Sequence, residues 1–111
     1  MVSGQLRLLV TTFADEQAAT TVVRRLLEEK LIACGTILPS AHSLYRWQGK
    51  IEESSESVVL MKTDPESAVR CMEVIQELHP YEVPEIILLE PEAVSEPYLF
   101  WVREALGKTE G

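Results

Sequence analysis

The sequence has few of the residues that mark common catalytic sites. Its five glycines are scattered over 111 residues, so it contains neither a phosphate-binding loop nor a dinucleotide fingerprint. It has no G-x-S-x-G sequence, and only two histidines could act as a base for a nucleophile. These absences argue against hydrolases and nucleotide-dependent enzymes. We therefore expect a protein without catalytic turnover.

Cysteines and long apolar runs are also scarce. Cys34 and Cys71 form no C-x-x-C pair, and no apolar run approaches the roughly 18 residues of a membrane span. The opening residues show no basic segment followed by the long apolar run of a secretory signal. We expect a cytoplasmic protein with reduced thiols that makes no use of the membrane and requires no cofactor for folding.

Basic residues are outnumbered by acidic ones. Ten Lys and Arg face eighteen Asp and Glu, which gives a formal net charge of -8. Such a surface repels phosphate backbones and attracts cations, so nucleic acid is not an expected partner. A hydrophobic content of 46% is enough for a real core. The length supports one domain, 1–111, although a chain this short buries only about two-thirds of its unfolded surface.

The predicted elements follow the order β-α-β-β-α-β with an extra C-terminal helix. We expect strands at 5–13, 31–38, 57–63 and 85–90, strand composition also at 43–51, and helices after the caps Asp15, Asp64 and Ser95. Pro80 must end the second helix, which places His79 at its exit. This order is the split βαβ arrangement of ferredoxin-like domains, so the predicted fold class is α+β.

The central hairpin is too long for the rest of the domain. The second strand with its continuation runs from about residue 32 to 47, and Gln48-Gly49 supplies a tight turn. Unbroken, it would span on the order of 50 Å, whereas the radius of gyration of such a domain is about 13 Å. The overhang would expose the apolar side chains of Leu44, Tyr45, Trp47 and Ile51. We expect an obligate oligomer built through this hairpin, with a flexible arm as the alternative.

Residues that could bind a metal are present but lack ligand spacing. They are Cys34, Cys71, His42, His79, Glu52, Glu53 and Glu56, without a C-x-x-C or H-x-x-x-H pattern. Copper or zinc would be the candidate ions if Cys34 and His79 met in space. His79 has an alternative role, because an imidazole at a helix C-terminus can cap terminal carbonyls.

The segment HPYEVPEI, residues 79–86, combines chemically interesting side chains with two prolines. Its first interpretation is a rigid connection, because Pro80 ends a helix and a strand begins at Glu85. Its chemistry depends on a neighbour. If a second subunit lies against it, His79, Tyr81 and Glu85 become candidate cleft residues.

Three stretches together resemble the CutA divalent-cation tolerance proteins. They are EKLIACGTILPSAHSLYRWQGKIEE, VVLMKT and HPYEVPEIILL. The resemblance implies a ferredoxin-like subunit in a homotrimer, with strands from the long hairpins pairing between subunits, in an architecture similar to that of the PII signalling proteins. It also implies association with divalent ions, copper above all. Of the thiol positions that some members use for copper, only Cys34 matches here.

The resemblance suggests two groups of site residues and two functions. Cys34 and His79 are the candidate metal ligands, and the candidate cleft or interface residues are Tyr45, Trp47, Lys62, Tyr81 and Glu85. The first function is a cytoplasmic homotrimer that binds divalent cations, copper being favoured, and contributes to the response to metal ions. The alternative is a PII-like signalling or scaffold trimer. Its inter-subunit clefts would hold a small anionic ligand or a protein partner, with Lys62 as the charged contact.

Overall fold

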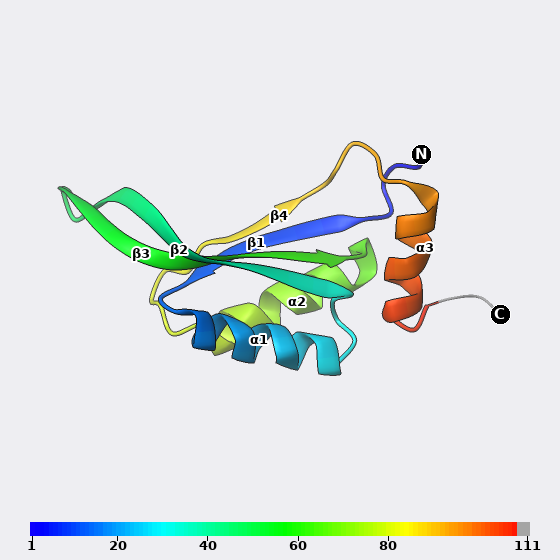
Figure 1. Cartoon of the computed structure of the whole chain (residues 1–111), viewed down its shortest axis with the longest axis horizontal. Coiled ribbons are helices and arrows are strands. Elements are labelled where there is room, and N and C mark those ends of the chain that lie inside the picture. Colours follow the sequence, from blue (N-terminus) through cyan, green and yellow to red (C-terminus); the bar gives the residue numbers. More distant parts are fainter. Residues whose placement is uncertain (109–111) are drawn as a thin grey trace.

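A four-stranded antiparallel sheet with the strand order β2-β3-β1-β4 forms the centre of the molecule (Figure 1). The computed structural model describes residues 1–108. Its elements are β1 (Arg7–Phe13), α1 (Glu16–Glu28), β2 (Cys34–Trp47), β3 (Lys50–Thr63), α2 (Pro65–Leu78), β4 (Ile86–Leu89) and α3 (Glu96–Ala105). This is the predicted ferredoxin-like order with an additional C-terminal helix, so the α+β prediction is confirmed.

Helices α1 and α2 cover one face of the sheet and form the main core with it (Figure 1). Each helix begins where the sequence predicts: Asp15 accepts a hydrogen bond from the Ala18 N–H at 2.8 Å, and Asp64 accepts one from the Ser67 N–H at 2.9 Å. Helix α3 packs on one end of the sheet through a second apolar cluster. No helix within residues 1–108 is both long and apolar enough to cross a membrane.

The β2–β3 hairpin projects well beyond the helices (Figure 1). The molecule measures 53 × 27 × 22 Å, and its radius of gyration is 15.0 Å, so the predicted overhang is confirmed. Pro39 does not end the strand, because a β-bulge between Leu38 and Ala41 absorbs the irregularity. At the tip, Gln48 and Gly49 both have positive φ, +49° and +79°, which is typical of a type I′ turn.

The return strand is longer than the sequence predicts. The sequence predicts this strand at 57–63, whereas β3 begins at Lys50. The Glu- and Ser-rich segment 52–56 has poor strand propensity, but each of its residues pairs with a residue of β2. Cross-strand pairing therefore overrides local composition in this segment.

The sheet face opposite α1 and α2 is apolar, and neither of these helices covers it. The strand register places its side chains in rows, because directly paired residues share a face. We call this surface the open face; its apolar residues are Leu8, Val10, Leu38, Val58, Leu60, Ile87 and Leu89. Leu38, Ile87 and Leu89 are 49%, 45% and 45% exposed. Such a surface is typical of an interface with another chain.

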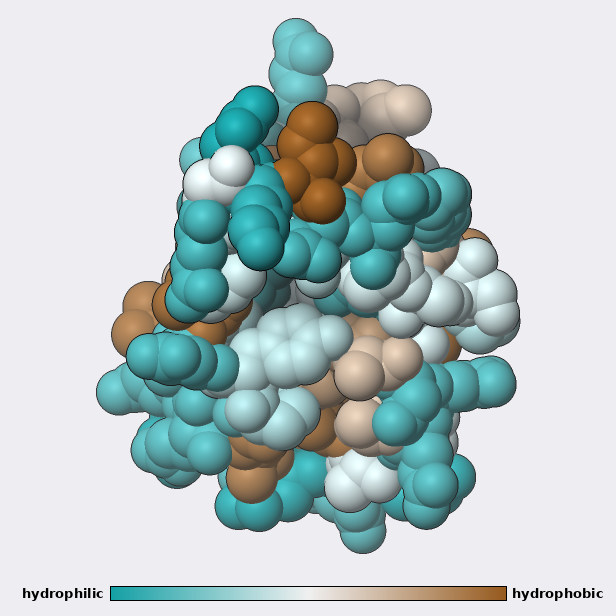
Figure 2. Space-filling model, turned by 90° about the vertical axis from the view of Figure 1, so that its left-hand side faces the viewer, coloured by the Kyte–Doolittle hydropathy of each residue, from teal (hydrophilic) through white to brown (hydrophobic). Residues whose placement is uncertain are grey.

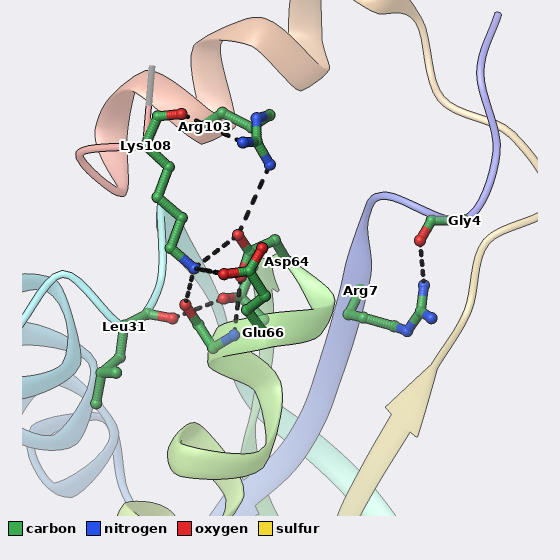
Figure 3. A network of polar contacts seen from close by, with 9 residues as sticks. Gly4, Arg7, Leu31, Asp64, Glu66, Arg103 and Lys108 are labelled. Carbon is green, nitrogen blue, oxygen red and sulfur yellow. Dashed lines mark hydrogen bonds and ion pairs between the residues drawn. The ribbon is translucent and has the colours of Figure 1, made fainter. Parts of the chain in front are cut away.

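A buried carboxylate fastens the C-terminal part of the described chain to the start of α2 (Figure 3). The Asp64 side chain is 1% exposed and accepts hydrogen bonds from the Lys108 Nζ at 2.8 and 3.0 Å. Lys108 also donates to the Ser67 Oγ at 2.9 Å. Burial alone would raise the pKa of Asp64, but the hydrogen bonds from Lys108 and Ser67 outweigh it and hold the pKa below its usual value.

Replacing Lys108 should therefore cost stability in a pH-dependent way. Because the pKa of Asp64 is lowered by folding, its contribution is present above the unfolded pKa of about 3.9 and is lost as the pH falls through the folded value. We expect Lys108→Met to lower the free energy of unfolding by about 2 kcal/mol at neutral pH. The difference from wild type should shrink at about pH 3.

Urea unfolding at the two pH values measures this difference. Arg70→Met is the matched control, because Arg70 is an exposed cation on α2 for which no ion pair is found among residues 1–108. The control should leave stability nearly unchanged at both pH values. A loss in Lys108→Met that does not vary with pH would show that the charge of Asp64 is not involved.

Candidate functional site

A cleft of ≈ 490 Å³ lies between the projecting hairpin and the segment 80–85 that follows α2. It is lined by Thr12, Ala14, Tyr45, Trp47, Ser54, Ser55, Glu56, Tyr81, Glu82, Val83 and Glu85. Figure 2 views the end of the molecule from which the hairpin projects, where hydrophilic side chains dominate and a few hydrophobic ones are exposed between them. Four of the predicted cleft residues, namely Tyr45, Trp47, Tyr81 and Glu85, thus line one cavity; their role at a subunit interface stays a prediction.

The hairpin register explains how the strands contribute to this cleft. Tyr45 and Trp47 are two residues apart on β2, so they lie on the same face of the hairpin. Ala41 pairs with Glu56 and belongs to the same alternating row as Tyr45, which places the Glu56 carboxylate on that face too. The cleft therefore has an aromatic part from β2 and an acidic part from β3.

His79 holds the other wall of the cleft in place. Its Nδ1 accepts a hydrogen bond from the Tyr81 N–H at 3.1 Å. Because a backbone amide can only donate, Nδ1 carries no proton, and the Nε2–H donates to the Thr12 carbonyl at 2.7 Å. The ring also stacks on Phe13 with centroids 4.4 Å apart. Both ring nitrogens are thus occupied within the chain, and a metal could bind His79 only if one of these bonds broke.

Tyr81 connects this wall to the hairpin. Its hydroxyl donates to the Glu56 Oε2 at 3.3 Å, and its ring lies 4.7 Å from that of His79. Burial raises the pKa of Tyr81, and the charge and hydrogen bond of Glu56 raise it further. The phenol therefore stays protonated at neutral pH and acts as a donor.

The charged side chains that line the cleft are all of one sign. Glu56, Glu82 and Glu85 line it, whereas no Lys, Arg or His belongs to its lining. These carboxylates do not converge, since residues 1–108 contain no group of three or more His, Cys, Asp or Glu side chains that could hold a metal ion. The cleft is therefore acidic without being a metal cage.

Cys34 and Lys62 lie at the other end of the sheet. They are direct cross-strand partners, and the Lys62 Nζ donates to the Thr36 Oγ1 at 3.0 Å. The Cys34 Sγ lies 3.7 Å from the Tyr98 hydroxyl. Burial and the contact with Cys34 raise the pKa of Tyr98 to about 12. Lys62 thus does not line the cleft of the single chain, and its predicted place in a cleft or interface between subunits stays a prediction.

Cys34 and His79 are not brought together within one chain. Lys62, the partner of Cys34, pairs with Leu8 at the start of β1, whereas His79 binds the carbonyl of Thr12 near its end. Leu8 and Thr12 are separated by about 13 Å along the strand. A metal site made of both residues stays a prediction that requires contact between chains.

The second cysteine behaves as a buried structural thiol. The Cys71 Sγ donates to the Leu31 carbonyl at 2.9 Å, and burial raises the pKa of this thiol to about 11. At neutral pH the group is therefore protonated and a poor metal ligand. His42 is also set apart, because its exposed ring pairs with Glu53 at 2.7 Å on the hairpin.

Sequence reasoning missed Glu56 as a member of the cleft. Counting back from the turn at 48 and 49 gives the pairing of Tyr45 with Glu52, and two further steps reach the row of Glu56. The signal was therefore present in the hairpin register. The contact of Glu56 with Tyr81 had no such signal, because it joins residues far apart in the sequence.

The structural role of His79 can be tested apart from any metal. We expect His79→Phe, which keeps a ring for stacking but loses both hydrogen bonds, to lower the free energy of unfolding by about 1–3 kcal/mol. The loss should be the same with and without excess chelator in a denaturant titration. His42→Phe, at an exposed histidine, is the control and should change little. A loss that appears only when metal is present would contradict the structural role.

Comparison with known proteins places the chain in a family. A family model described as CutA1 divalent ion tolerance protein matches residues 7–105. The divalent-cation tolerance protein CutA of Pyrococcus horikoshii is 43% identical over 91% of this chain and 98% of its own length. The mouse protein CutA is 37% identical over 93% of this chain, but the chain spans only 58% of that relative.

Solved structures agree with this assignment. CutA from Synechococcus elongatus superimposes with a TM-score of 0.90 at 37% identity, covering 96% of this chain and 94% of the other. The periplasmic divalent cation tolerance protein CutA from Archaeoglobus fulgidus gives a TM-score of 0.86 at 30% identity, covering 91% and 98%. Since sequence and structure match over nearly the whole chain, this protein belongs to the CutA1 divalent ion tolerance family.

Proposed function

We propose that the chain acts as a cytoplasmic homotrimer that binds divalent cations, with copper as the favoured ion, and contributes to metal tolerance without catalytic turnover. Its relatives are named for divalent-cation tolerance, and membership of their family supports the same role here. The net charge of -8 adds a general attraction for cations. The A. fulgidus relative is described as periplasmic, so the compartment is part of the proposal.

The exposed apolar side chains of the open face are the main structural support for the proposed trimer. Covering one Leu or Ile side chain contributes about 1.5–3 kcal/mol, and several such side chains are exposed on this face in a single chain. Closed rotational symmetry lets each copy bury this surface without leaving a free end. The proposed number of copies, three, follows what the family resemblance implies.

The metal-binding part of the proposal centres on Cys34. This residue lies in the same rows of the open face as Leu8 and Leu89, so a trimer would place it against another chain. Ligands from two chains could then complete a site that one chain lacks. His79 joins such a site only by giving up one of its two hydrogen bonds.

The PII-like alternative receives less support from the geometry. Lys62, its proposed charged contact, lies away from the cleft, and the cleft itself is lined by carboxylates. A small anion would be repelled there. An anionic ligand beside Lys62 would lie on the open face, so this alternative requires a cleft formed there between subunits.

The trimer can be tested with a matched pair of substitutions. Leu38 and Val69 are 49% and 64% exposed, but only Leu38 lies on the open face. We expect Leu38→Asp to reduce the mass in light scattering from three chains to one, because a charge would be buried without a partner. Val69→Asp should remain trimeric. A trimeric Leu38→Asp protein or a monomeric wild type would overturn the assembly proposal.

The metal proposal is tested by calorimetry on the assembled protein. Titration with Cu²⁺ and Zn²⁺ should show saturable binding in wild type and at least about tenfold weaker binding in Cys34→Ser, because a thiolate is a stronger ligand for these ions than a hydroxyl. Cys71→Ser is the matched thiol control and should bind as wild type does. Equal binding by Cys34→Ser, or none by wild type, would exclude a site at Cys34.

A further inference from the structure

We propose that the cleft between the hairpin and the segment 80–85 binds a small organic cation of the amine or quaternary ammonium class. This site is separate from the metal proposal and does not depend on it. The cleft volume of ≈ 490 Å³ falls within the range of small-molecule sites and exceeds the need of a single ion. Three features of the cleft favour such a ligand: its aromatic rings, its charges and the fixed geometry of its wall.

Three aromatic side chains line the cleft. Tyr45 and Trp47 come from β2 and are 44% and 43% exposed, so large parts of their rings stay accessible in the chain. Tyr81 faces them from the segment after α2. The faces of such rings attract cations through their quadrupole, Trp most strongly, and groups of them recognise alkylated ammonium ligands.

The charges of the lining select the sign of the ligand. Glu56, Glu82 and Glu85 contribute carboxylates, and no cationic side chain of the lining balances them. In a concave site, like charges reinforce one another and concentrate the opposite charge. A cation is favoured, and an anionic metabolite is disfavoured.

The arrangement suits an organic cation better than a metal ion. A metal such as Ca²⁺ or Mg²⁺ needs several oxygen ligands converging within about 2–2.6 Å. The described part of the chain offers no group of three or more acidic, His or Cys side chains that could do this. An alkylammonium group is larger, makes longer contacts and uses ring faces as well as carboxylates.

The wall of the cleft is held in position before any ligand arrives. The hydroxyl of Tyr81 donates a hydrogen bond to Glu56, and the backbone N–H of Tyr81 donates one to His79. The His79 ring in turn donates a hydrogen bond to the Thr12 carbonyl. Pro80 and Pro84 restrict the same segment. Less conformational entropy is therefore lost on binding.

The proposal is tested on the assembled wild-type protein in excess chelator, so that metal binding cannot contribute. The probes are choline, tetramethylammonium and putrescine, with 3,3-dimethylbutan-1-ol as the neutral isostere of choline. We expect at least one cation to bind saturably by calorimetry and to change tryptophan fluorescence. The neutral isostere should bind at least about tenfold more weakly than choline, because it lacks the charge.

Variants assign the binding to the cleft. Trp47→Leu and Glu85→Gln should each weaken cation binding by about tenfold. Trp101→Leu is the control for the first, since Trp101 is a similarly exposed tryptophan on α3, and Glu92→Gln is the control for the second. Glu85→Gln keeps the size of the side chain and removes its negative charge, so it remains informative if Trp47→Leu alters assembly in light scattering.

Several results would overturn the proposal. They are absence of binding by all three cations, equal binding of choline and its neutral isostere, or unchanged binding in Glu85→Gln. If a cationic side chain of a neighbouring chain fills the cleft in the trimer, none of the three cations will bind. That result also overturns the proposal. None of these outcomes depends on the copper titrations of the Cys34 variants, so the two proposals can fail separately.

Discussion

The pairing of β2 with β3 determines where every candidate functional residue of the hairpin lies. The type I′ turn at Gln48 and Gly49 sets the register at the tip, and the bulge after Leu38 shifts it once toward the base. Because strand side chains alternate between faces, a slip of β2 by one residue would move Tyr45 and Trp47 to the face opposite Glu56. The cleft exists only in the observed register.

The same register connects the cleft to the open face. Thr12 pairs with Val58 and continues the row of Leu8 and Val10 along β1, and Thr12 also lines the cleft. Glu56 continues the alternating positions of Val58 and Leu60 along β3. A chain that covers the open face would therefore border the cleft. Assembly and ligand binding are expected to influence each other through this shared face.

Local signals made most of the fold predictable. The caps Asp15 and Asp64 and the turn at 48 and 49 act within a few residues, and the structure has each of them where the sequence indicates. The strand at 52–56 was missed because its composition opposes its pairing. The ion pair of Asp64 with Lys108 was also missed, because 44 positions separate the two residues and no local sequence pattern predicts their contact.

The candidate site was only partly predictable, for the same reason. The motifs identified candidate side chains by residue type but could not predict where they lie. The distance along β1 keeps Cys34 and His79 apart, and the hydrogen bonds of His79 use both of its ring nitrogens. The segment from His79 to Glu85 therefore contributes first through shape. Through its hydrogen bonds with the Tyr81 N–H and the Thr12 carbonyl, His79 holds Tyr81 against the hairpin. The groups left free to bind a ligand are therefore the aromatic rings and carboxylates of the cleft. These groups recognise positive charge without donating a metal ligand set.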